Sequence, residues 1–202
     1  MEKKLEILIV GDSFAADWTV KYPDQKGWPN LLSEDLNYKV TNIAQAGISQ
    51  YKIWKQLESI DINNFDIIII SHTSPYRIHT KKHPVHCNDV LHKNADLIIF
   101  DTFYHKRKIK NIFNFSLKCA AQWFKYHYDE NYQKDIYQLV KDKIDNIIKN
   151  KKTIKISNFD DDNVESDLNY FKYLKSNPGI MNHFDEKINY KIYKEIKEKI
   201  DA

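Results

Sequence analysis

Glycine is scarce in this sequence, which holds 4 glycines among 202 residues, where average usage of about 7% would give about 14. The scarcity excludes collagen-like chains and Gly/Ser linkers, and the 42% hydrophobic content excludes a disordered chain. Glycine is the residue that tolerates positive φ and close backbone approach. We therefore expect Gly11, Gly27, Gly47 and Gly179 to lie where no other residue fits.

Cysteine and long apolar runs are also scarce. Cys87 and Cys119 form no spacing motif, so we expect no disulfide framework and a reducing compartment. The longest apolar run, Ile67–Ile70, is far shorter than the roughly 20 residues that span a bilayer. The first residues show neither the apolar core nor the cleavage site of a signal peptide. These absences predict a soluble, cytoplasmic protein with no membrane partner.

Charge is nearly balanced, with 31 basic and 28 acidic residues and a net charge of +3. Arginine is rare, because Arg77 and Arg107 are the only two. A nucleic-acid-binding protein usually shows a clustered, arginine-containing basic face. We interpret the one dense basic run, residues 106–110, as a solvated face and expect no nucleic-acid partner. The length suits one domain over residues 1–202.

Short apolar runs alternate with amphipathic stretches along the chain. We expect strands over residues 5–10, 38–44, 65–70 and 153–157, and helices opening at Gly27-Trp28-Pro29 and running over 49–60, 116–128, 135–150 and 184–200. This alternation predicts a three-layer α/β/α sandwich with a flavodoxin-like parallel sheet. Residues 74–152 are predicted to be a helical insertion in the same domain, within which 95–100 could be helix or strand. Asn182 is the expected N-cap of the last helix.

Three blocks carry residues suited to nucleophilic chemistry. Gly11-Asp12-Ser13-Phe14 follows the first strand directly, so Ser13 should point into the crevice where open α/β sheets bind ligands. Gly47 follows the second strand at the same sheet edge. His183 precedes the last helix, from which it can reach Ser13. We expect Asp12 to shape the turn at the serine.

These blocks resemble those of the SGNH (GDSL-type) hydrolases. Gly11-Asp12-Ser13 matches the first block, Gly47 after a strand containing Asn42 matches the second, and His183 before an amphipathic helix matches the last. The resemblance covers residues 5–73 and 153–200. It implies a serine esterase or deacylase acting through an acyl-enzyme, with carbohydrate O-acetyl esters as the substrate class. It assigns Ser13 as nucleophile, His183 as base, and the amides of Ser13 and Gly47 as oxyanion donors.

The sequence departs from that family at two positions. Thr73 stands where the family has an asparagine that donates to the oxyanion, and Arg77 is a second candidate for that charge or for binding an anionic substrate. Ile180 stands where the family has the aspartate that orients the histidine. Asp185, the three aspartates at 160–162, or a Ser–His dyad without any acid remain open.

Two further clusters have competing interpretations. Five histidines and Cys87 suggest a metal site; the histidines are His72, His79, His83, His86 and His92. Pro84 interrupts the helical spacing that metal ligands would need. We therefore expect no metal or other cofactor, and a polar loop at the cleft entrance. The aromatic stretch at Trp123, Phe124, Tyr126, Tyr128 and Tyr132 is expected to pack in a helical core.

The expected substrate is a small-molecule or carbohydrate ester. Two alternatives to hydrolysis stay open. An O-acyltransferase would move the acyl group from Ser13 to a sugar hydroxyl. A binding or assembly protein would keep the fold with an impaired site, as the missing asparagine and aspartate allow.

Overall fold

The computed structural model describes residues 4–159, 166–176 and 183–202. Its sheet has five strands in the order β2-β1-β3-β4-β5, and every neighbouring pair is parallel. The strands are β1 (Leu5–Gly11), β2 (Tyr38–Asn42), β3 (Ile67–His72), β4 (Lys152–Ser157) and β5 (Leu168–Asn169). This order is that of flavodoxin-like folds, which confirms the predicted fold class. The sequence analysis missed β5, which has only two residues in a polar stretch.

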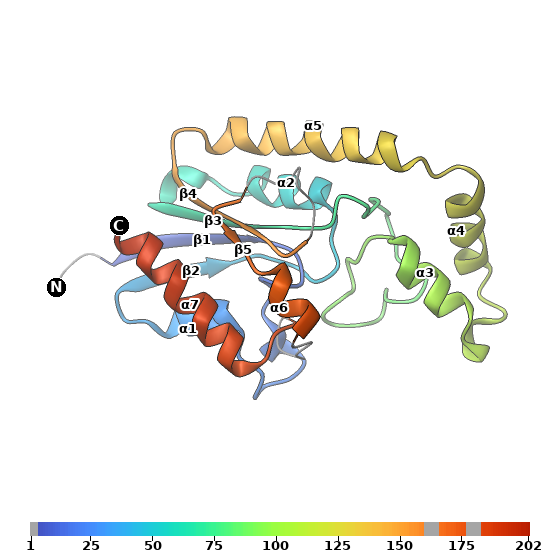
Figure 1. The fold of residues 1–202 in the computed structure, drawn as a ribbon, viewed down its shortest axis with the longest axis horizontal. Helices are drawn as coiled ribbons and strands as arrows, with labels where there is room; N and C mark the ends of the chain where they lie inside the picture. The colour runs from blue at the N-terminus through green and yellow to red at the C-terminus, as the bar shows by residue number, and fades with distance from the viewer. Residues whose placement is uncertain (1–3, 160–165, 177–182) are drawn as a thin grey trace.

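Helices cover both faces of the sheet (Figure 1). On one face lie α1 (Trp28–Glu34) and α7 (Glu186–Asp201); on the other lie α2 (Gln50–Glu58) and α5 (Glu130–Ile148). Alternate residues of β1 explain the arrangement, because Ile7 and Ile9 pack with α1 and α7 while Leu8 and Val10 pack with α2 and α5. Each such fully buried side chain stabilises the fold by about 1.5–3 kcal/mol.

The start of the last helix differs from the expectation. The helix begins at Glu186, and its N-cap is Asp185, whose carboxylate accepts a hydrogen bond from the Ile188 amide at 2.8 Å. Asn182, the expected cap, lies outside the described residues. Aspartate is as good a cap as asparagine, and the sequence alone could not choose between them.

The insertion between β3 and β4 is helical, as predicted. It holds α3 (Ile99–Lys106), α4 (Phe115–Tyr126) and α5. In the ambiguous stretch 95–100, Leu97 forms an antiparallel bridge with Ile78, and α3 begins two residues later. Figure 1 shows α3 and α4 beyond the ends of the strands, on the side opposite both termini. Short helices over Trp18–Val20, Ile62–Asn64, Ile109–Asn111 and Phe171–Ser176 (α6) complete the described elements.

Candidate active site

The turn that carries Ser13 leaves β1 at Gly11. This glycine has φ +150°, and a Cβ there would lie 2.7 Å from the backbone oxygen of Ser71 on β3. Only glycine allows the two strand ends to come this close. Ser13 therefore stands at the carboxyl edge of the sheet, as predicted, and its side chain is 6% exposed.

The side chain of Asp12 stabilises this turn through hydrogen bonds. Its Oδ1 accepts hydrogen bonds from the Phe14 amide at 3.1 Å and from the Ser71 hydroxyl at 3.3 Å. Burial raises the pKa of Asp12 to about 7, although the Phe14 amide and the charge of Arg77 act against that rise. The geometry matches the expected turn-shaping role, and the raised pKa lets this carboxyl hold a proton near neutral pH.

Two tryptophans fix the backbone around the serine, and sequence reasoning missed both roles. The indole Nε1 of Trp18 donates to the Ser13 carbonyl at 2.9 Å, and that of Trp28 donates to the Phe14 carbonyl at 2.9 Å. Buried indoles need such acceptors. The nucleophile turn is therefore held by side chains from two helices as well as by its own hydrogen bonds.

Ser13 and His183 meet at hydrogen-bond distance. His183 Nε2 lies 2.9 Å from Ser13 Oγ. The imidazole packs against the rings of Phe14, with 4.6 Å between ring centroids, and of Trp18, with 5.3 Å. His183 has φ +66°, a left-handed conformation that costs a non-glycine residue of order 1 kcal/mol or more. Such strain is typical of functional positions.

No described carboxylate forms a hydrogen bond or ion pair with His183. Asp185 is the N-cap of α7 instead, and the aspartates at 160–162 lie outside the described residues, as do Gly179 and Ile180. Burial first, and then the charges of His92 and Arg77, together lower the pKa of His183 to about 4. Among described residues the pair is therefore a Ser–His dyad with a neutral imidazole.

Gly47 forms the second side of the site. It has φ +77°, and a Cβ there would lie 2.9 Å from the Ala95 Cβ. The guanidinium of Arg77 donates from Nη1 to the Gly47 carbonyl at 2.9 Å and to the Asp96 carbonyl at 3.3 Å. The backbone amides of Ser13 and Gly47 donate to no described residue. An oxyanion hole needs backbone amides without a protein partner, and both residues line the same cavity.

Thr73 lies beneath the site rather than in it. Its side chain is fully buried, and its Oγ1 makes no hydrogen bond within the described part of the chain. The hydroxyl is close enough to Asp12 to lower the pKa of that carboxyl. This placement gives the expected oxyanion role of Thr73 no support.

The serine, the histidine and Gly47 line one cavity of about 470 Å³. Its polar wall also holds Arg77 and Asp96, and its apolar wall includes Ile98, Phe100 and Phe159. The volume is that of small-molecule sites, which are mostly apolar with a few placed polar groups.

A cluster of histidines around Asp101 forms the far wall of this cavity. His83, His86 and Asp101 line it. The Nε2 atoms of His83, His86 and His105 lie 3.5, 3.3 and 3.3 Å from carboxylate oxygens of Asp101. The loop over residues 81–90 contains turns and no helix, in agreement with the expectation from Pro84 and with a polar loop at the cleft.

Three of these residues are the best metal-ligand set in the described chain. Ligand atoms of His83, His86 and Asp101 all lie within 4.8 Å of one another. However, His83 Nδ1 accepts hydrogen bonds from the Val85 and His86 amides at 3.2 and 3.1 Å. The ring proton therefore sits on Nε2, which points toward Asp101 without a free lone pair for a metal. In this arrangement His83, His86 and His105 hold the carboxylate of Asp101 in place.

The other histidines singled out in the sequence have separate partners. His72 is fully buried at the end of β3, where its Nδ1 lies 2.8 Å from Gln50 Nε2. His79 is exposed and lies 3.4 Å from Asp96. His92 pairs with Asp89 at 3.3 Å. The five histidines that invite a metal site in the sequence therefore do not share one set of partners.

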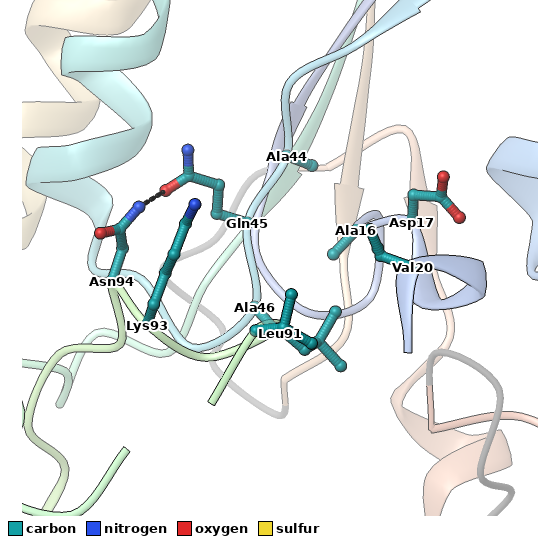
Figure 2. Close-up of a pocket in the computed structure, with 10 residues that line it drawn as sticks. Ala16, Asp17, Val20, Ala44, Gln45, Ala46, Leu91, Lys93 and Asn94 are labelled. Atoms are coloured by element: carbon teal, nitrogen blue, oxygen red, sulfur yellow. Dashed lines mark hydrogen bonds between the residues drawn. The ribbon is translucent and has the colours of Figure 1, made fainter. Parts of the chain in front are cut away.

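The insertion is tied to the loop before Gly47 at a second, smaller pocket of about 130 Å³ (Figure 2). There Asn94 donates to Gln45 at 2.8 Å. Asp96, close by, accepts from the Ser49 and Thr80 amides at 2.8 and 2.7 Å and pairs with Lys52 at 2.8 Å. Asp96 had no signal in the sequence, because its partners come from distant segments.

No family model matches this chain, and no curated protein matches it either. None of the described helices has the length and apolar character needed to cross a bilayer.

Proposed function

We propose that this protein is a serine hydrolase that cleaves acyl esters, with Ser13 as nucleophile and His183 as base. The observation that carries the proposal is the 2.9 Å approach of His183 Nε2 to Ser13 Oγ inside a cavity of about 470 Å³. A nucleophile and a base within hydrogen-bond reach are the minimum requirement of this chemistry.

The reaction proceeds in two halves. Ser13 Oγ attacks the ester carbonyl carbon while His183 Nε2 takes the serine proton. The tetrahedral intermediate collapses, the carbon–oxygen bond to the alcohol breaks, and His183 returns the proton to the departing alcohol. Water then attacks the acyl-serine, gives a proton to His183, and releases the acid as Ser13 regains its proton.

The open amides of Ser13 and Gly47 supply the oxyanion donors. Arg77 contributes indirectly, because its guanidinium holds the Gly47 carbonyl and so restrains the backbone at this residue. Its charge also favours a negatively charged oxygen in the cavity. The substrate class suggested by the family resemblance is a carbohydrate O-acetyl ester, and 470 Å³ accommodates one sugar residue with its acetyl group.

Turnover should be slow for this type of enzyme. Burial and the neighbouring charges lower the pKa of His183 to about 4, and no described carboxylate stabilises the imidazolium. A base with so low a pKa takes a proton less readily than one near the working pH.

Hydrolysis of small acetyl esters tests the proposal. Wild type should release acetate, while Ser13→Ala and His183→Ala, each checked for folding by circular dichroism, should fall to the uncatalysed rate. Turnover that requires an added sugar acceptor would instead indicate the acyltransferase. Absence of turnover with every ester and acceptor would favour a binding protein.

A further inference from the structure

The segment from Thr102 to Tyr128, which contains most of α3 and all of α4, carries charge of one sign only. It has six basic residues and no aspartate or glutamate, although acidic and basic residues nearly balance over the whole chain. The basic residues are Lys106, Arg107, Lys108, Lys110, Lys118 and Lys125. All but Lys108, which is half-buried, are exposed.

These helices and the connection between them expose large apolar side chains. Phe113 is 95% exposed, Ile109 83% and Phe115 77%. Ile99, Phe100, Tyr104, Ile112, Trp123 and Tyr126 are exposed as well. Core packing of the aromatic stretch, expected from the sequence, is therefore wrong for the exposed Trp123, Tyr126 and Tyr132. It is right for Phe124, which is 4% exposed. A concentration of exposed apolar groups marks an interaction site.

We call these exposed apolar and basic side chains of residues 99–126 the α3–α4 surface. It lies beyond the carboxyl ends of the strands (Figure 1), at the end of the sheet where the cavity opens. Phe100 belongs both to this surface and to the lining of the Ser13 cavity. Whatever covers the surface therefore sits at the cavity mouth.

We propose that the α3–α4 surface binds an anionic lipid bilayer, with Phe113 and Phe115 inserted among the lipids and the lysines on the headgroups. Exposed aromatic and aliphatic side chains among lysines are the pattern of segments that lie in the membrane interface. Basic residues close to an anionic leaflet add to binding individually. This inference replaces the expectation of no membrane partner, and it does not depend on Ser13 being a nucleophile.

Charge distinguishes lipid from other occupants. Two copies of this chain facing each other through the surface would oppose six basic residues with six more, which repel. Protein interfaces are depleted in lysine, whereas five of the six basic residues here are lysine. Nucleic-acid binding favours arginine, but Arg107 is the one arginine among these six basic residues.

Vesicle co-sedimentation of the full chain tests the proposal. Wild type should bind vesicles of phosphatidylcholine with phosphatidylglycerol at least about ten-fold more strongly than phosphatidylcholine alone, because each basic residue contributes roughly five-fold. Binding should weaken in about 1 M salt, where the Debye length falls to about 3 Å.

Two variants of the surface and two matched controls locate the binding. Lys106→Glu with Lys110→Glu, and separately Phe113→Ser with Phe115→Ser, should each reduce binding to anionic vesicles about ten-fold or more. Leu36→Ser removes a side chain that is 81% exposed near α1, and Lys187→Glu reverses an exposed charge on α7; both should bind as wild type does.

Three results would overturn the proposal. Equal binding of wild type to neutral and anionic vesicles would show that the basic residues do not drive binding. Equal loss of vesicle binding in the surface variants and the control variants would show that binding does not occur at the α3–α4 surface. A change of oligomeric state in Phe113→Ser, measured by sedimentation velocity, without any vesicle binding by wild type would assign the surface to a second copy. Circular dichroism of each variant separates loss of binding from loss of fold.

Discussion

Ser13 Oγ lies 2.9 Å from His183 Nε2, although 170 positions separate the two residues in the chain. The fold produces this meeting, because β1 lies inside the sheet between β2 and β3 and α7 packs back across the face that holds Ile7 and Ile9. His183, just before α7, thus lies at the carboxyl edge of β1.

The low pKa of His183 predicts an unusual pH profile. With the pKa lowered to about 4 by burial and nearby positive charge, the imidazole is neutral, and able to accept a proton, from about pH 5 upward. The rate of serine labelling by a fluorophosphonate should therefore rise between about pH 3 and 5 and stay level to pH 8. A midpoint at or above the ordinary histidine pKa of about 6.5 would contradict this.

The raised pKa of Asp12 should make the free energy of unfolding depend on pH. Burial raises its pKa to about 7 in the folded state, so the folded protein binds this proton more tightly than the unfolded chain. Stability of wild type is therefore lost through this group as pH rises from about 4 to 7, by about 1.4 kcal/mol per unit of pKa difference.

Asp12→Asn cannot ionise and escapes this loss. Denaturant unfolding should show the free energy of unfolding of Asp12→Asn increasing relative to wild type by a few kcal/mol between pH 4 and 7. The histidines that also titrate in this range are common to both proteins and largely cancel. A difference that is the same at both pH values would refute the assignment.

Substitution of Gly47 by alanine should lower the free energy of unfolding, and a second substitution at Ala95 should recover part of that loss. Gly47→Ala would place a methyl group at φ +77° and 2.9 Å from the Ala95 Cβ, which should cost about 2–4 kcal/mol from backbone strain and overpacking together. Adding Ala95→Gly removes the clash but leaves the strain, so the double variant should regain part of the loss. No recovery would show that the contact with Ala95 is unimportant.

The sheet and its helices could be predicted because their signals are local. Apolar runs such as Ile67–Ile70 and the four-residue spacing of Ile188, Ile192, Ile196 and Ile200 need no distant partner to be recognised. The approach of His183 to Ser13 was also predicted, because a residue just before the last helix can reach the sheet edge that holds the serine.

The remainder of the site depends on contacts that no local pattern contains. Asp96 joins Gly47, Ser49 and Lys52 of one segment to Thr80 of another. The indole of Trp28 reaches the carbonyl of Phe14 from a helix that was predicted, but its acceptor lies in a different segment of the chain. Exposure of Phe113 could not be inferred either, because an aromatic residue in an insertion is equally consistent with a buried position.

Substitutions of Arg77 distinguish the effect of its positive charge from the effect of the hydrogen bonds that it donates. Its Nη1 donates to the carbonyls of Gly47 and Asp96, an arrangement that the single ammonium of lysine cannot copy. Arg77→Lys and Arg77→Gln should both slow fluorophosphonate labelling, by about 10²-fold, which is the loss typical of one misplaced oxyanion donor. Full activity in Arg77→Lys alone would show that positive charge, and not the position of Gly47, is what matters.

Mapping a fluorophosphonate adduct by peptide mass spectrometry tests the central claim most directly. The account predicts one adduct, on Ser13, in the folded wild type. It further predicts no adduct in Ser13→Ala and labelling slowed by at least about 10³-fold in His183→Ala, with Ser74→Ala, another buried serine, labelled as wild type. Absence of any adduct on Ser13, or labelling that does not change when His183 is replaced, would contradict it.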